Sequence, residues 1–131
     1  MANMLVRSSL TPEDEEAIHD TIGSAIRVHR ELGPGLPERF YRSAFCVELD
    51  AQGISYVTEH PVAVSYRGRP LGIQRLDLLV EKRVVVELKA VDRLDAVHRA
   101  QLLSYLRAAR LRAGLLFNFN AVTLVIRRVV L

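Results

Sequence analysis

The chain has 131 residues, half of them hydrophobic and a quarter charged, which is the composition of one soluble globular domain rather than of a disordered or fibrous protein. Its single cysteine, Cys46, excludes an intrachain disulfide and a cysteine-rich zinc site. The formal net charge of +3 is compatible with a polyanionic partner but is too small to identify one.

Residues 1–10 lack the long apolar core of a secretory signal, and no later run of residues approaches the length of a membrane span. We therefore expect a flexible lead over residues 1–10 and a single domain over residues 11–131. We also expect a cytoplasmic location and no contact with a membrane.

Two helices are predicted in the first half. Thr11 can cap a helix over residues 12–32, and the sequence Gly33-Pro34-Gly35 would end it. A second helix is predicted from Pro37 to Gln52, with Gly53 after its last residue. Its apolar positions are expected to face inward: Phe40, Ala44, Phe45, Val47 and Leu49.

The second half is predicted to alternate strands with one further helix. Pro61 interrupts the first extended stretch, which favours an edge strand or a bend. Asp95 can cap a helix from Ala96 to about Arg112, and Gly114 would end it. The predicted strands cover residues 54–60, 62–66, 71–80, 84–90, 115–119 and 124–130.

The third helix lies between the strand over residues 84–90 and the strand over residues 115–119. A connection of this length allows the two strands to run parallel, with a right-handed crossover. The hairpin formed by residues 71–80 and 84–90 adds an antiparallel pair. The predicted fold is therefore α/β, with a mixed β-sheet flanked by helices.

That hairpin carries charges where buried strands would carry none. If its turn centres on Lys82, Asp77 lies across from Glu87, and Glu87 shares a strand face with Lys89. Opposed carboxylates destabilise a sheet unless a cation lies between them, and hard oxygen ligands suit Mg²⁺ or Mn²⁺. The alternative is an ordinary solvated face, although the flanking residues are almost all apolar, as in strands covered on both sides.

Other candidate residues have a structural and a functional interpretation. Glu38 in the first turn of a helix can compensate the helix dipole. His98, Gln101 and Tyr105 lie on one side of the third helix, and His98 could donate to a phosphate or be an ordinary surface group. Arg75 could contact phosphate or form a salt bridge.

Several ordered motifs resemble a known family. They are GLPERFY at residues 35–41, preceded by HRELGPG at 29–35, then DLLV at 77–80, VELKA at 86–90, HRAQLLSYL at 98–106 and LLFNFN at 115–120. In this combination the chain resembles the GxxExxY proteins of the PD-(D/E)XK nuclease superfamily. One departure is Leu76, which stands where the superfamily usually has proline.

The resemblance implies a restriction-endonuclease-like core and a metal-dependent site. Its catalytic triplet would be Asp77, Glu87 and Lys89, joined by Glu38 and Gln101 from the flanking helices. Asp77, Glu87, the Leu88 carbonyl and Glu38 would hold Mg²⁺ or Mn²⁺. Beside these residues, Tyr105, one turn after Gln101, could line the same groove, and Arg75 and His98 could contact a phosphate of the substrate.

The expected activity is hydrolysis of phosphodiester bonds in nucleic acid, with DNA as the first choice of partner. Two other functions remain open. A catalytically silent module on the same fold could bind nucleic acid or an unidentified protein partner. The apolar strand over residues 124–131 could instead form a homodimer interface.

Overall fold

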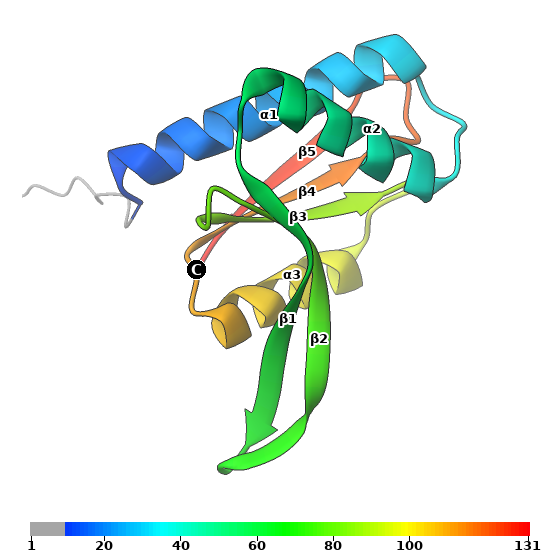
Figure 1. The fold of residues 1–131 in the computed structure, drawn as a ribbon. Helices are drawn as coiled ribbons and strands as arrows, with labels where there is room; N and C mark the ends of the chain where they lie inside the picture. The colour runs from blue at the N-terminus through cyan, green and yellow to red at the C-terminus, as the bar shows by residue number, and fades with distance from the viewer. Residues whose placement is uncertain (1–9) are drawn as a thin grey trace, which may run out of the picture.

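The computed structural model describes residues 10–131, so the expected lead lies, except for Leu10, outside the described residues. Five strands form one sheet, with helices α1 and α2 on one face and α3 on the other (Figure 1). In chain order the elements are α1 (Pro12–Leu32), α2 (Glu38–Gln52), β1 (Tyr56–Tyr66), β2 (Arg69–Val80), β3 (Val84–Lys89), α3 (Ala96–Ala109), β4 (Ala113–Asn118) and β5 (Val125–Val130).

The sheet order follows the chain from β1 to β5. β3 and β4 run parallel and are joined through α3, whereas the other neighbouring strands are antiparallel. The predicted mixed α/β sheet flanked by helices is therefore confirmed. In the part of the chain that the structure describes, no helix is both long and apolar enough to cross a membrane.

Helix α1 begins and ends where its capping residues predict. The Thr11 hydroxyl accepts a hydrogen bond from the Asp14 N–H at 3.0 Å, and the Asp14 carboxylate accepts one from the Thr11 N–H at 3.1 Å. This reciprocal pair satisfies two donors that the first helical turn leaves free. Gly33 follows the last helical residue with a φ of 64°, a conformation that glycine adopts without steric cost.

Helix α2 buries a different stripe from the one expected. Tyr41, Phe45 and Leu49 are fully buried, whereas Phe40 and Val47 are 46% and 68% exposed, so the inward orientation predicted for these last two is wrong. Residues four apart share one helix face, and the Tyr41 ring selects that face. It stacks on Phe119 at 4.8 Å between centroids, and its hydroxyl donates to the Gly33 carbonyl.

Strand β1 is the edge strand that Pro61 favours, but it is continuous rather than interrupted. The outer side of an edge strand has no ladder partner, so a proline, which has no N–H to donate, is tolerated there.

The turn between β2 and β3 lies where the sequence predicts it. Partners in β2 and β3 are equidistant from Lys82, and Glu81 and Lys82 both have positive φ, as in the primed turns of tight hairpins.

Gly114 lies inside β4, so the prediction that it ends the third helix is wrong. Helix α3 stops at Ala109, and Arg110 takes the left-handed capping conformation with a φ of 57°. The glycine has a packing role instead. A Cβ atom on Gly114 would lie 2.9 Å from the Leu102 Cδ1, so glycine allows α3 to pack closely on the sheet.

We expect Gly114→Ala to reduce the free energy of unfolding by about 1 kcal/mol, because the added methyl overpacks the fully buried Leu102. Gly23→Ala in α1 is the matched control. Its Cβ would meet only the Arg27 Nη1 at 3.6 Å, so better helix propensity should stabilise the protein by roughly 0.5–1 kcal/mol. Equilibrium urea unfolding measures both, and a stabilising Gly114→Ala would contradict the packing role.

Candidate functional site

The site lies where β2 separates from β3. Backbone pairing between these strands covers only three residue pairs and ends at Leu78 and Val86. Beyond that point the Leu88 N–H donates to the Asp77 Oδ2 at 3.0 Å. A side-chain carboxylate thus replaces the carbonyl that a continuing ladder would supply. This exchange holds the Asp77 carboxylate against the backbone of β3.

The other side of β2 is irregular at the same level. Thr58 pairs with Leu78 and His60 with Leu76, but Glu59 between them has a φ of 53°, which is uncommon for a residue other than glycine. The Asp77 N–H donates instead to the Glu87 Oε1 at 3.2 Å. Asp77 therefore bonds to β3 through both its side chain and its backbone, and the second bond orients Glu87.

Glu87 is a buried acid without an ion-pair partner among residues 10–131. It is 4% exposed, and burial raises its pKa to about 8, with the nearby Asp77 carboxylate adding to the increase. The Asp77 N–H and the positive charge of Lys89 act in the opposite direction but do not cancel the rise. A pair of acids in this position favours either a shared proton or a bound cation.

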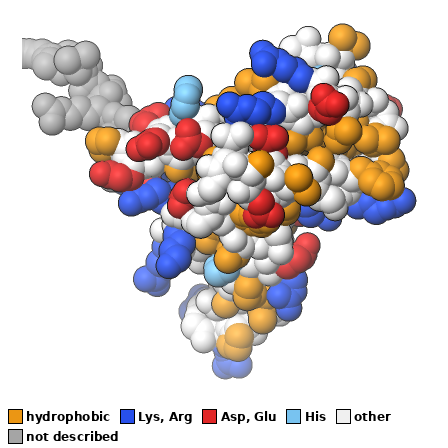
Figure 2. All heavy atoms as spheres, turned by 45° about the horizontal axis from the view of Figure 1, so that its top comes forward, with side chains coloured by type: hydrophobic (Ala, Val, Ile, Leu, Met, Phe, Trp, Pro, Cys, Tyr) orange, Lys and Arg blue, Asp and Glu red, His pale blue; other side chains and the backbone are white. Residues whose placement is uncertain are grey.

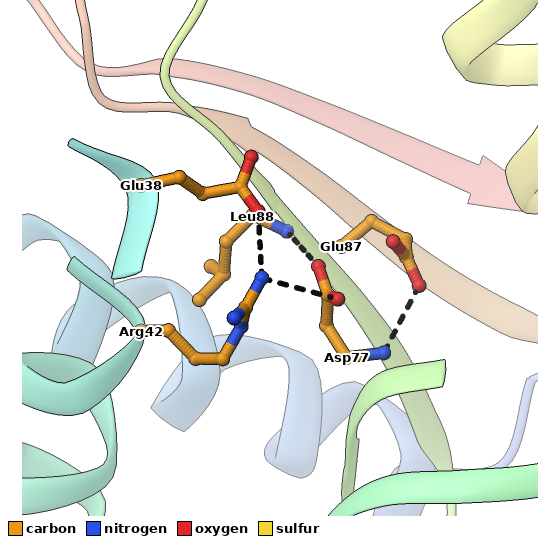
Figure 3. A network of polar contacts seen from close by, with 5 residues as sticks. All are labelled: Glu38, Arg42, Asp77, Glu87 and Leu88. Atoms are coloured by element: carbon orange, nitrogen blue, oxygen red, sulfur yellow. Dashed lines mark hydrogen bonds and ion pairs between the residues drawn. The ribbon is translucent and has the colours of Figure 1, made fainter. Parts of the chain in front are cut away.

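Arg42 of α2 was not among the residues predicted from the sequence, but it contacts two of the candidate residues (Figure 3). Its Nη2 donates to the Glu38 Oε2 at 2.6 Å and lies 3.5 Å from the Asp77 Oδ1. Arg42 therefore links α2 to the strand that carries Asp77. The available signal was its spacing of four residues from Glu38, which places both side chains on one helix face.

Lys89 and Tyr105 lie on the α3 side of the sheet with Glu87. Glu87 and Lys89 alternate with Val86 and Leu88, which point to the α1 and α2 side. Tyr105 is 8% exposed, and burial raises its pKa, to which the charges of Glu87 and then Asp77 contribute. The Tyr105 hydroxyl is thus close enough to sense both carboxylates.

The remaining candidates are not joined to the carboxylates by hydrogen bonds among the described residues. Gln101 is exposed on α3, one turn before Tyr105. The His98 Nδ1 accepts a hydrogen bond from the Asp95 N–H at 3.0 Å and completes the N-terminal cap of α3. Arg75 is exposed on β2 opposite Pro61. The structure thus gives His98 a local capping contact.

The residues present fit a hard divalent cation. Asp77 and Glu87 supply carboxylate oxygens, and the Leu88 carbonyl faces the same side as the Leu88 N–H, because both backbone groups of a strand residue point to one neighbour. The next carbonyl, of Lys89, accepts from the Phe119 N–H on the β4 side. Mg²⁺ commonly uses one or two carboxylates and keeps several waters, so a larger acidic cluster, which is absent from residues 10–131, is not required.

Comparison with known proteins identifies one family. The family model of the PD-(D/E)XK nuclease superfamily matches residues 15–129, which includes every candidate residue named above. No curated protein and no solved structure matches the chain significantly.

We expect Glu87→Gln to stabilise the metal-free protein, more so at high pH. The folded-state pKa of Glu87 lies above its ordinary value, so the folded protein keeps a proton that the unfolded chain has lost, and stability falls as pH rises from about 4.5 toward about 8. Glutamine keeps an acceptor for the Asp77 N–H and removes the charge, which should be worth on the order of 1 kcal/mol or more at alkaline pH.

Urea unfolding in a chelating buffer at acidic and alkaline pH measures this difference. Glu48→Gln serves as the control and should change little, because the Glu48 carboxylate accepts a hydrogen bond from the Gln52 side chain on the surface of α2. A Glu87→Gln protein less stable than the unchanged chain at alkaline pH would show that the buried charge is already compensated.

Proposed function

Because the chain belongs to the PD-(D/E)XK nuclease superfamily, we propose that it is a metal-dependent nuclease that hydrolyses phosphodiester bonds of nucleic acid through Asp77, Glu87 and Lys89. The observation that carries this proposal is the pair of carboxylates joined across the separation of β2 and β3. Asp77 bonds to the Leu88 N–H, and Glu87 bonds to the Asp77 N–H. The proposed nuclease domain covers residues 11–131.

We also place the chain in the GxxExxY group of that superfamily. The motif covers Gly35 to Tyr41, and its last residue has a structural role that supports the assignment. The Tyr41 hydroxyl donates to the Gly33 carbonyl at 2.5 Å and accepts from the Leu36 N–H at 3.1 Å. This tyrosine fixes the connection between α1 and α2, and thereby the position of Glu38.

A Mg²⁺ or Mn²⁺ ion held by Asp77, Glu87 and the Leu88 carbonyl would polarise the phosphate and stabilise the leaving oxygen. The protein holds the metal-binding carboxylates in position before the ion binds. Two backbone N–H donors each bind one oxygen of the Asp77 and Glu87 carboxylates and favour their present orientations. Burial of Glu87 keeps bulk water away from that side of the site.

The half-buried Lys89 lies on the Glu87 face of β3 and acts on the side of the attacking water. Its ammonium group positions that water and offsets negative charge that develops on the phosphate. Gln101, exposed on α3, holds the water or the Lys89 ammonium by hydrogen bonding. Tyr105 lines the same side of the site, next to the two carboxylates.

Arg42 favours one competing function, a catalytically silent binding module on the same fold. Its guanidinium lies 3.5 Å from the Asp77 Oδ1 and can neutralise that carboxylate without a metal. In the proposed nuclease, Glu38 acts through Arg42 as well as through the metal. It accepts the Arg42 hydrogen bond at 2.6 Å and can draw the guanidinium away from Asp77.

The nuclease activity is tested with end-labelled DNA and RNA in Mg²⁺ or Mn²⁺ buffer. Asp77→Asn and Glu87→Gln should each lower the cleavage rate by about 100-fold or more, because they weaken charge stabilisation of the transition state. Lys89→Ala should lower it roughly 100-fold.

Lys82→Gly is the matched lysine control, since glycine suits the φ of 57° at the hairpin turn. It should cleave like the unchanged protein. Equal cleavage by the unchanged protein and all three site variants would reject the nuclease assignment.

We expect Arg42→Gln to bind Mn²⁺ about fivefold more tightly than the unchanged protein. Its guanidinium competes with the cation for the Asp77 carboxylate, and an exposed or partly exposed ion pair of this kind is worth about 1 kcal/mol. Isothermal titration calorimetry measures the affinity without reference to activity.

Arg39→Gln is the control on the same helix, because the Arg39 guanidinium lies 4.7 Å from the Phe40 ring centroid and has no ion pair among the described residues. It should leave Mn²⁺ affinity unchanged. Weaker Mn²⁺ binding by Arg42→Gln would mean that the arginine supports the metal site rather than competing with it.

A further inference from the structure

The charges of this protein are divided between the two sides of its sheet. Helices α1 and α2 carry nine acidic residues against four arginines. Residues 60–76 and 96–131 contain no aspartate or glutamate. They contain nine arginines, at positions 67, 69, 75, 99, 107, 110, 112, 127 and 128, of which Arg128 pairs with Glu15 of α1 on the acidic side. The net charge of +3 is therefore the sum of an acidic region, formed by α1 and α2, and basic regions elsewhere in the chain.

The first basic stretch forms a projecting arm, which we define as residues 60–76 of the β1–β2 hairpin. β2 pairs with β3 only from Leu78 onward, so within the arm the two strands pair with each other alone. Figure 1 shows the arm extending past α3, away from the helices on the opposite face. Figure 2 looks toward that opposite face, where acidic side chains gather over the N-terminal part of α1.

The base of the arm is fixed to α3 by apolar contacts. Val62 and Leu76 are buried in the same cluster as Leu102, Tyr105 and Leu106. This cluster holds the arm at a defined position relative to the candidate site, because Tyr105 also senses the charges of Glu87 and Asp77. The arm is thus anchored beside the carboxylates.

A groove of about 380 Å³ runs between the arm and the C-terminal half of α3. One wall is formed by residues 63–65 of β1, and the other by Ser104, Arg107, Ala108 and Arg110. Its lining includes two arginines and no acid. Arg107 and Arg110 are exposed, and the residues that the structure describes offer neither of them an ion pair.

Helix α3 connects this groove with the candidate site. Gln101, Tyr105 and Ala108 lie at successive turns of one face, so that face leads from the carboxylates toward the groove lining. Arg67 and Arg69 are exposed at the turn of the arm beside Tyr66, which is 66% exposed. Arginines beside an exposed aromatic ring suit contacts with phosphates and with a base.

We propose that the groove between the arm and α3 binds the sugar–phosphate backbone of the nucleic-acid substrate and directs it to Asp77 and Glu87. This inference rests on the proposed nuclease function, and it adds the surface that holds the substrate. The chemistry recognised is a chain of phosphates, so affinity depends strongly on salt and weakly on sequence. The acidic side formed by α1 and α2 repels the same ligand.

The test measures binding of fluorescent single-stranded and duplex DNA by anisotropy in a chelating buffer, where metal-dependent cleavage is absent. The variants are Arg107→Gln/Arg110→Gln for the groove and Arg67→Gln/Arg69→Gln for the arm. Each pair should weaken binding by roughly tenfold or more and lower the slope of log affinity against log salt by about two.

Arg27→Gln/Arg30→Gln is the matched control, because it removes the same charge from α1 on the opposite side. It should bind almost like the unchanged protein. Equal weakening by all three pairs would indicate a response to net charge alone and overturn the proposal, as would unchanged binding by the groove and arm variants. Vesicles containing anionic lipid are a parallel probe, and groove-dependent binding to them without DNA binding would also overturn it.

The outcome is separable from that of the nuclease assay. Cleavage that depends on Asp77, together with unchanged DNA binding by the groove variants, would reject the groove and keep the nuclease. Groove-dependent DNA binding without any cleavage would keep the surface and favour the silent binding module.

Discussion

The structure depends on two carboxylates that lie close together at one position in the sheet. Asp77 and Glu87 bring two carboxylates together where β2 leaves β3, and Glu87 is almost fully buried. Little water reaches Glu87 to stabilise its charge, and the cations nearby, Lys89 beside Glu87 and Arg42 beside Asp77, offset only part of the cost. The protein keeps both acids in place with backbone N–H donors, which is a costly arrangement for a purely structural hairpin. A divalent cation between the two carboxylates would offset their repulsion. The same pair of acids would therefore destabilise the metal-free fold and bind the metal of the proposed reaction.

The surrounding fold supports this position from both sides. The alternating residues of β3 pack under α1 and α2 on one face and toward α3 on the other, so the strand that carries Glu87 and Lys89 is rigidly placed. Tyr41 fixes the turn before α2 and thereby the pair formed by Glu38 and Arg42. Gly114 allows α3 to pack closely on the sheet through Leu102, on the same side as Tyr105. Local packing choices far apart in the chain thus converge on the same site.

Local signals in the sequence predicted the parts of the fold that local physics controls. The caps of α1, the turn at Lys82 and the parallel crossover through α3 follow from capping residues, strand alternation and connection length. The buried face of α2 did not, because Phe40 and Val47 are as apolar as the residues that pack, and the stacking of Tyr41 on Phe119 is a contact between distant segments. Gly114 resembled a helix terminator because its role depends on Leu102, which only the folded chain brings near.

In the candidate site, the facing positions of Asp77 and Glu87 could be predicted by counting residues from the turn at Lys82. The contact of Arg42 with Asp77 and the left-handed Glu59 could not, since both depend on the way that β2 bends away from the sheet.

We propose that Asp77 and Glu87 hold a divalent cation at the separation of β2 and β3. The most direct measurement is anomalous X-ray diffraction from crystals grown with Mn²⁺. We expect an anomalous peak in contact with carboxylate oxygens of both Asp77 and Glu87, with the Arg42 guanidinium turned away from Asp77. Crystals that hold Mn²⁺ at other positions while Arg42 remains on Asp77 and no peak lies between the two carboxylates would contradict it.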